Sequence, residues 1–322
     1  MGGHRAGASF LAIVAAILVT SAPATSASAT SASATSASAI AGAALTGVAA
    51  ATGPPVSAAS GDGTVRVPSR PSRILSLSAS ATQMLYAIGA GSQVIGVDKY
   101  STYPAGAPRT KFTGYESSAE DYLYLRPDLV IFAFKSGTLI QQLRLLDIPT
   151  LLLPPAKDFA GVYGQLAELG TATGHAAGAR RAQSSLQADL RAQVRAAGHR
   201  GWGDSYYIEV DPTLYAATSH TFIGAEFSLF GMDDIADAAG GGVAYPQVSA
   251  EFIVKEDPDY VFLADTVCCQ QSAVTFAKRP GFSQLRAVRL HHVIEVNDSV
   301  ASQWGPHTIE VLVGLLARTL RS

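Results

Sequence analysis

Short apolar runs alternate with amphipathic stretches along the chain from residue 72 onward. In the first half, the runs at residues 73–78, 94–97, 128–134 and 150–153 have the length of strands and are rich in aliphatic and aromatic side chains. Most of the stretches between them have helical spacing. Strands that alternate with helices form parallel sheets covered on both faces, so the pattern predicts an α/β fold.

The same alternation returns after residue 200, with strand candidates at residues 205–210, 260–264 and 293–296. Between the two halves, residues 176–197 are polar, contain no proline and are rich in strong helix formers. A helix of this length would extend ~33 Å at 1.5 Å per residue, about the width of a small domain. We expect it to span two lobes and restrict hinge opening; the alternative is a surface helix within one domain.

Two segments of the chain echo each other without a gap. Residues 118–132 (SAEDYLYLRPDLVIF) and 249–263 (SAEFIVKEDPDYVFL) each predict a Ser-capped helix with an acidic first turn, a Pro-Asp turn and a buried strand. The echo predicts two lobes built on similar plans, with Glu120 and Glu251 at equivalent exposed corners. These carboxylates either grip a symmetric basic partner or only stabilise the starts of their helices.

The N-terminal region has the features of an export signal. Residues 10–19 are apolar but shorter than the ~20 residues that a membrane-spanning helix needs, and small residues follow at Ala27-Ser28-Ala29. We expect a signal peptide over residues 1–29, the alternative being a membrane anchor. Residues 30–66 are rich in Ala, Ser, Thr and Gly and predict a flexible tether. The protein is then extracytoplasmic, in the periplasm or cell wall, and no lipid-attachment cysteine follows the apolar run.

The rest of the chain divides, by the same patterns, into three parts. We expect an N-terminal lobe over residues 67–157, linking helices over 158–200 and a C-terminal lobe over 201–322. Charged residues make up 15% of the chain and the net charge is −2, which gives no footprint for binding nucleic acid.

Several enzyme motifs are missing from the sequence. It has no phosphate-binding loop, no G-x-S-x-G elbow and no H-E-x-x-H helix, so we expect no catalytic residues. A two-lobed metal chelatase is the main enzyme alternative; it would need a His paired with an acid, and His220 and His307 have no evident acidic partner. A cell-wall scaffold would explain the tether but not the echoing halves.

Four segments together carry a resemblance to a known family: RILSLSASATQMLYAIGAGSQVIGV, SAEDYLYLRPDLVIF, YPQVSAEFIVKEDPDYVFL and SQWGPHTIEVL. Over residues 67–322 the chain resembles the periplasmic binding proteins that serve ABC importers of cobalamin, ferric siderophores and haem. The third segment is especially similar to the cobalamin-binding branch. The resemblance implies a class III solute-binding fold, in which two lobes of parallel sheet and flanking helices are joined by one long interdomain helix.

The resemblance also implies a function and partners. A metal chelate would bind between the lobes of a monomer that has no resident cofactor or metal of its own. The partner would be an ABC permease dimer with its ATPase, and Glu120 and Glu251 match the positions at which the family docks onto permease arginines.

In open α/β lobes, ligands bind beyond the carboxyl ends of the strands. The loops at those positions are rich in aromatic residues and poor in arginine, which suits a large flat ligand such as a corrinoid or haem better than an anionic catecholate complex. The alternative is that several of these aromatics pack in the core. The candidate ligand contacts are Ser78, Ala79, Tyr100, Tyr103, Tyr115, Lys135, Phe222, Tyr245, Gln270 and Trp304.

The two cysteines of the chain, Cys268 and Cys269, are adjacent. In an oxidising compartment they could close a vicinal disulfide near the mouth of the ligand site. A soft metal ligand or two free thiols are the alternatives.

Overall fold

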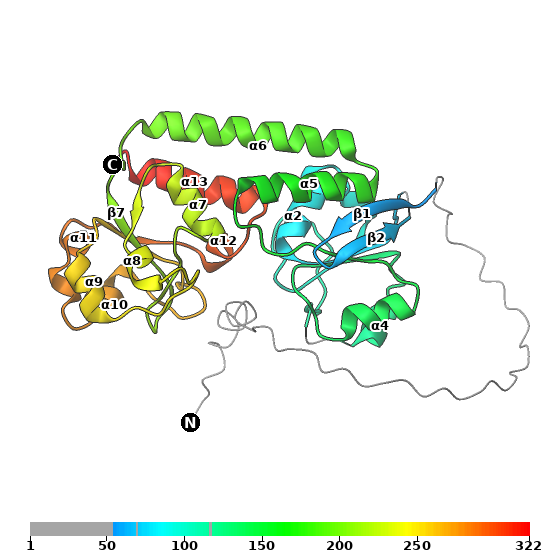
Figure 1. Cartoon of the computed structure of the whole chain (residues 1–322), viewed down its shortest axis with the longest axis horizontal. Helices are drawn as coiled ribbons and strands as arrows, with labels where there is room; N and C mark the ends of the chain where they lie inside the picture. Colours follow the sequence, from blue (N-terminus) through cyan, green and yellow to red (C-terminus); the bar gives the residue numbers. More distant parts are fainter. Residues whose placement is uncertain (1–53, 69, 116–117) are drawn as a thin grey trace, which may run out of the picture.

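The computed structural model describes residues 54–322, except residues 69, 116 and 117. It consists of two α/β lobes that lie side by side, with one long helix running along both of them (Figure 1). The predicted signal peptide and the tether up to residue 53 lie outside the described residues. Within the part of the chain that is described, no helix has the length and apolar character that a membrane crossing requires.

The N-terminal lobe is built on a fully parallel sheet with the strand order β4-β3-β5-β6. All four residues of β3 and of β5 are buried, as expected for strands covered on both faces. Its strands are β3 (Ile74–Leu77), β4 (Val94–Val97), β5 (Leu129–Phe132) and β6 (Thr150–Leu152). Its helices are α2 (Ala79–Ala87), α3 (Ala119–Leu123) and α4 (Leu139–Leu145), with a short 3-10 turn at Gly91–Gln93.

The C-terminal lobe repeats this plan with the strand order β11-β10-β7-β8, and β9 also pairs with β7. Strands β7, β9, β10 and β11 are parallel, whereas β8 runs antiparallel to β7, a detail that the predicted parallel sheet did not include. The strands are β7 (Ser205–Asp211), β8 (Tyr215–Ala216), β9 (Asp233–Asp234), β10 (Tyr260–Leu263) and β11 (Val293–Glu295). The helices are α7 (Phe222–Ser228), α8 (Ala236–Gly240), α9 (Ala250–Glu256), α10 (Ala273–Ala277), α11 (Arg286–Arg289) and α12 (Asp298–Ala301), with a 3-10 turn at Phe282–Gln284.

Three helices join the lobes. Helix α5 (Phe159–Thr173) starts at Asp158, whose carboxylate accepts the Gly161 N–H, and ends at Gly174 in the left-handed conformation (φ 75°). Helix α6 (Ala176–Ala197) has the predicted bounds and packs on α5 and on the last helix, α13 (Pro306–Thr319). Because α6 passes over both lobes (Figure 1), the predicted interdomain helix is confirmed.

The tether prediction is wrong for residues 54–66. Strands β1 (Val56–Ser60) and β2 (Gly63–Val67) form an antiparallel hairpin that packs on the N-terminal lobe. Ala58 and Val67 are each 1% exposed, and the Gly61 N–H donates to the Leu152 carbonyl over 2.8 Å. The alternation of buried and exposed residues did not predict strands here because the composition of this stretch resembles that of the low-complexity region before it.

The echoing segments fold as matching units in the two lobes. In each, a Pro-Asp turn follows the helix, and its aspartate fastens the first strand of the lobe. Asp128 accepts the N–H groups of Ser72 and Arg73 (2.8 and 2.9 Å), and Asp259 accepts the Ser205 N–H (2.9 Å). Helix α3 packs against α4, and both α4 and α9 lie on the side of the molecule opposite α6 (Figure 1).

Candidate functional site

A cavity opens between the lobes, where the carboxyl ends of β3 and β5 face α12 and the segment that follows it. It contains about 820 Å³ of empty space, part of which is open solvent. This position beyond the strand ends is where the α/β architecture places ligands. Six of the predicted ligand contacts line the cavity: Ser78, Ala79, Tyr100, Tyr115, Lys135 and Trp304.

Four predicted contacts lie outside this cavity. Tyr103 stacks on His307 with ring centres 3.7 Å apart, and Phe222 packs edge-on against Phe159 at 5.4 Å. Tyr245 packs against the core, where burial raises the pKa of its hydroxyl to about 12. Gln270 is exposed in the loop after β10, with φ at 56°. Phe222 and Tyr245 therefore pack in the core, which was the alternative considered for some of these aromatic residues.

Sequence reasoning missed several residues that line the cavity. They are contributed mainly by the ends of β3, β4 and β5 and by the α12 region, and the most informative are Asp98, Phe132, Ser299 and Ser302. Asp98 follows β4 directly, which is the one signal that could have identified it. The two serines lie where the second lobe meets the first, which no local pattern indicates.

The floor of the cavity on the N-terminal side is held by buried hydroxyl groups. The Ser78 hydroxyl caps α2 by accepting the Ala81 N–H over 3.2 Å. Behind it, the Thr82 hydroxyl donates to Ser76 Oγ and contacts Ser101 Oγ, each over 2.9 Å. The first turn of α2 is therefore fixed where it borders the cavity.

Asp98 is the buried acid of this floor. Its side chain accepts the Ser101 N–H over 2.8 Å, and it is only 5% exposed. Burial raises the pKa of the carboxyl group to about 6, although hydrogen bonds from Ser101 and Tyr100 and the Lys99 charge act in the opposite direction. At neutral pH most molecules therefore carry an ionised carboxylate in a largely desolvated position.

The opposite wall is tied to the N-terminal lobe by side-chain hydrogen bonds. The Trp304 N–H donates to Ser80 Oγ over 3.0 Å, and its indole Nε1 donates to Gln165 Oε1 over 2.8 Å. The Gln83 amide donates to Gln303 Oε1 over 2.7 Å. Because the indole N–H is already engaged and Trp304 is 7% exposed, this residue offers the cavity an apolar surface.

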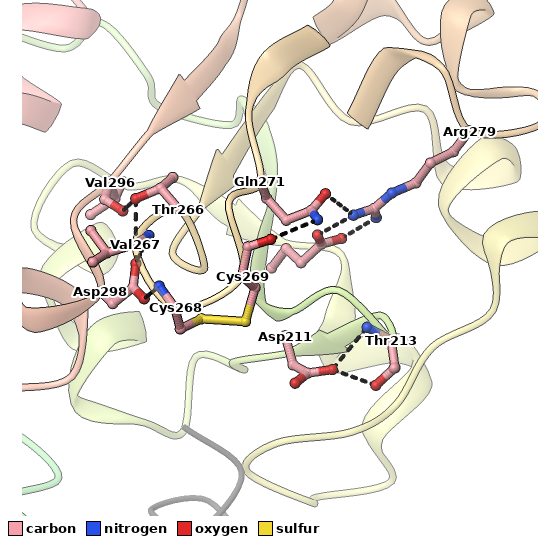
Figure 2. The surroundings of a disulfide bond; sticks show 11 residues. Asp211, Thr213, Thr266, Val267, Cys268, Cys269, Gln271, Arg279, Val296 and Asp298 are labelled. Atoms are coloured by element: carbon pink, nitrogen blue, oxygen red, sulfur yellow. Dashed lines mark hydrogen bonds and ion pairs between the residues drawn. A yellow bond between two sulfur atoms is a disulfide. The ribbon is translucent and has the colours of Figure 1, made fainter. Parts of the chain in front are cut away.

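Cys268 and Cys269 form a vicinal disulfide in the loop after β10 (Figure 2). The Asp298 carboxylate accepts the N–H groups of Cys268 (2.6 Å) and Val267 (2.9 Å). Asp298 is the first residue of α12, whose Ser299 lines the cavity. The disulfide itself does not line the cavity, but the loop that contains it is attached to helix α12, which does.

A buried ion pair lies beneath this loop. Arg279 donates two hydrogen bonds to the Glu209 carboxylate, both over 2.6 Å, and a third to Gln271 Oε1 over 2.9 Å (Figure 2). Asp265 is fully buried beside them; burial and the Glu209 charge raise the pKa of its carboxyl group to about 8. Asp265 is therefore protonated at neutral pH, which leaves the Glu209–Arg279 pair balanced in charge.

The described residues contain no group of three or more His, Cys, Asp or Glu side chains arranged to hold a metal ion. His307, one of the histidines considered for a chelatase, stacks on Tyr103.

The sequence matches the model of a protein family described as periplasmic binding protein over residues 74–300. The chain belongs to this family. It is 30% identical over 255 residues to an ABC transporter substrate-binding lipoprotein, YvrC, of Bacillus subtilis, covering 76% of this chain and 79% of that protein. It is 31% identical over 260 residues to a cobalamin-binding protein of Halobacterium salinarum, covering 76% and 69% of the two chains.

Solved structures share the fold at lower identity. The vitamin B12-binding protein BtuF of Vibrio cholerae aligns with a TM-score of 0.62 at 21% identity, over 78% of this chain and 98% of that one. The haem-binding protein RhuT of Roseiflexus sp. RS-1 aligns with a TM-score of 0.67 at 22% identity, over 77% and 97%. These alignments confirm the predicted class III fold, and family membership favours a solute-binding protein over the chelatase and scaffold alternatives.

Proposed function

We propose that the protein is the extracytoplasmic solute-binding component of an ABC importer and that it captures a metal chelate in the cavity between its lobes, without chemical turnover. The observation that carries the proposal is the cavity itself, which lies beyond the strand ends and is lined by Tyr100, Tyr115, Phe134 and Trp304. Aromatic walls of this kind bind large flat ligands by burial and stacking. A cobalamin-type corrinoid is the first candidate, since a relative at 31% identity is named for binding cobalamin; ferric siderophores and haem are the others.

The ligand contacts in this proposal come from both lobes. Tyr100 and Tyr115 supply aromatic surface, Ser78 and Ala79 supply polar groups at the start of α2, and Lys135 lies at the exposed rim. Trp304 closes the far wall. The other four candidates, Tyr103, Phe222, Tyr245 and Gln270, would reach the ligand only if the lobes moved.

Two exposed carboxylates are suited to docking on the importer. Glu120 and Glu251 occupy equal places in the two echoing helices, and both are exposed. Hydrogen bonds from their own backbone N–H groups and from the capping serines lower the pKa of both carboxyl groups, so both are ionised at neutral pH. One monomer thus presents two like charges to the two basic sockets of a permease dimer with its ATPase.

Thermal unfolding of the purified full chain with candidate ligands tests the proposal. A ligand that binds only the folded state stabilises it by RT ln(1 + [L]/Kd), about 2.7 kcal/mol at a hundredfold excess over Kd. We expect such a rise in Tm with cyanocobalamin, and the test includes haemin and a ferric hydroxamate siderophore. No shift with any of the three chelates would contradict the proposal.

A further inference from the structure

The interior of the cavity has an uneven distribution of charge. Of the residues that line it, Asp98 and Lys135 carry a formal charge near neutral pH. Lys135 is exposed at the rim, whereas Asp98 is only 5% exposed. The Lys99 ammonium does not line the cavity; it lies 5.0 Å from the centre of the Tyr100 ring. Among the described residues of the lining, the negative charge therefore lies in the interior and the positive charge lies at the edge.

The position of Asp98 is fixed by buried groups on two elements. Ser101 donates its N–H to Asp98 Oδ1 over 2.8 Å, and the Ser101 hydroxyl is in turn 2.9 Å from Thr82 Oγ1 on α2. The Asp98 N–H donates to the Ser76 carbonyl at the end of β3 over 3.0 Å. These partners are themselves buried, with exposures of 0 to 1% for Ser76, Thr82 and Ser101. These contacts hold Asp98 in place beside the cavity that it lines.

A buried carboxylate is costly unless it is paired or hydrogen-bonded, and such groups occur at ligand sites as well as in structural networks. The remaining polar side chains of the lining, such as Ser302 and Gln303, are neutral. A carboxylate accepts hydrogen bonds from N–H donors more strongly than a neutral acceptor does. It repels a second carboxylate most where water is excluded.

We propose that Asp98 determines the class of chelate that the cavity accepts: one whose periphery carries amide N–H donors, and not one whose periphery carries carboxylates. The inference deepens the proposed function and rests on it. It predicts that a corrinoid with amide side chains binds, and that a ring of the same shape with carboxylate side chains is rejected.

The test compares two corrinoids by isothermal titration at pH 8 with the full chain. One is cyanocobalamin, which carries side-chain amides, and the other is a corrinoid whose side-chain amides have been hydrolysed to carboxylates. We expect the wild-type protein to prefer the amide form by about 100-fold, because a like charge placed at a desolvated contact costs several kcal/mol. Equal affinity of the wild-type protein for both forms would overturn the proposal without any variant.

Asp98→Asn removes the charge and keeps the shape. We expect this variant to bind the amide corrinoid about 10-fold more weakly and the carboxylate form at least about 10-fold more tightly, so that the preference largely disappears. Asp189→Asn, which makes the same change at an exposed position of α6 outside the cavity, is the matched control and should leave cyanocobalamin affinity within about twofold. A thermal scan of each variant verifies that it is folded.

The outcomes separate the two claims. If Asp98→Asn binds cyanocobalamin and keeps the wild-type preference, the role of Asp98 is wrong while the proposed function stands. If the folded wild-type protein binds neither corrinoid, the proposed corrinoid ligand is wrong and the Asp98 assignment fails with it.

Discussion

The two lobes share a plan but differ in what lies at the carboxyl ends of their strands. In the N-terminal lobe the ends of β3 and β5 open onto the cavity, and residues from Leu77 to Lys135 form most of its lining. In the C-terminal lobe the Glu209–Arg279 pair lies near the end of β7, and the described residues of this lobe that line the cavity are Ser299 and residues 302–304. The N-terminal lobe therefore supplies most of the ligand-binding surface, and the C-terminal lobe supplies one rigid side of the cavity.

What the lobes have in common is the frame around the echoing segments. Asp128 and Asp259 fasten equivalent strands, and Glu120 and Glu251 start equivalent helices. The ligand-facing loops lie outside the echo, where the sequences diverge. The echoing segments, which the two lobes share, therefore suit a symmetric partner. The ligand-facing loops, which differ between the lobes, suit an asymmetric ligand.

The largest expected effect concerns the feature that the lobes share. Replacing Glu120 and Glu251 together by alanine should lower uptake of the ligand by at least about 100-fold, because each carboxylate is proposed to form a desolvated pair with the permease. Ligand affinity of the purified protein should not change. Transport into cells that carry the cognate importer, with titration calorimetry in parallel, measures both quantities.

Glu256→Ala, which removes another acidic side chain of α9, is the control for this double variant and should transport normally. Uptake that persists in the double variant would show that the echo serves folding alone.

The next effect concerns the buried ion pair of the C-terminal lobe. Arg279→Ala leaves the fully buried Glu209 carboxylate without its ion-pair partner and should lower the free energy of unfolding by about 3–5 kcal/mol. Urea titration followed by circular dichroism measures this. Lys255→Ala breaks an exposed pair with Glu256 and should cost less than about 1 kcal/mol. Equal losses in the two variants would show that the buried pair stabilises the C-terminal lobe no more than an exposed pair does.

A third prediction uses the pH dependence of the free energy of unfolding to test the burial of Asp98 in the N-terminal lobe. The pKa of Asp98 is raised to about 6 in the folded protein, above its ordinary value of 3.8, so the folded state binds the proton more tightly. The resulting stabilisation is present below pH 4 and is lost as the pH rises through 6. Nearby groups that influence this titration are Lys99, Ser101 and Tyr100.

Because Asp265 and Asp234 have raised pKa values as well, the informative quantity is the difference between wild type and Asp98→Asn. Relative to the variant, the wild-type free energy of unfolding should fall by about 1–3 kcal/mol between pH 4 and pH 7. Urea titrations of both proteins at several pH values measure this, and a difference that does not vary with pH would contradict the burial of an ionised Asp98.

The smallest effect compares two tyrosines of the same lobe. Tyr115 and Tyr103 are 45% and 43% exposed, but only Tyr115 lines the cavity. Tyr115→Ala should weaken ligand binding about 10-fold through loss of aromatic surface, and Tyr103→Ala should leave affinity within about twofold. Titration calorimetry decides between them; a larger loss with Tyr103→Ala would mean that the ligand lies elsewhere.

The sequence predicted those parts of the molecule that depend on local pattern. Residues 176–197 became α6 at the predicted bounds because helix formers continue without a proline. The caps and turns of the echo followed from Ser, Glu and Pro-Asp at fixed spacing. The hairpin at residues 56–67 was missed because it has few buried positions and directly follows a stretch of biased composition.

Part of the site was predictable because loops that follow strands contribute to it, as at Ser78 and Tyr100. The burial of Asp98 depends on Ser101 and Thr82, which only the folded chain brings together. The bond from Trp304 to Gln165 joins residues 139 positions apart, and no local pattern encodes it. Phe222 has the composition of a ligand contact, but it packs on Phe159 instead.

A crystal structure of the protein grown with saturating cyanocobalamin tests the central claim most directly. The account predicts one corrinoid per chain, between Tyr100 and Tyr115 on one side and Ser302 to Trp304 on the other, with a side-chain amide donating to Asp98. A corrinoid bound outside the cavity between the lobes would contradict the account.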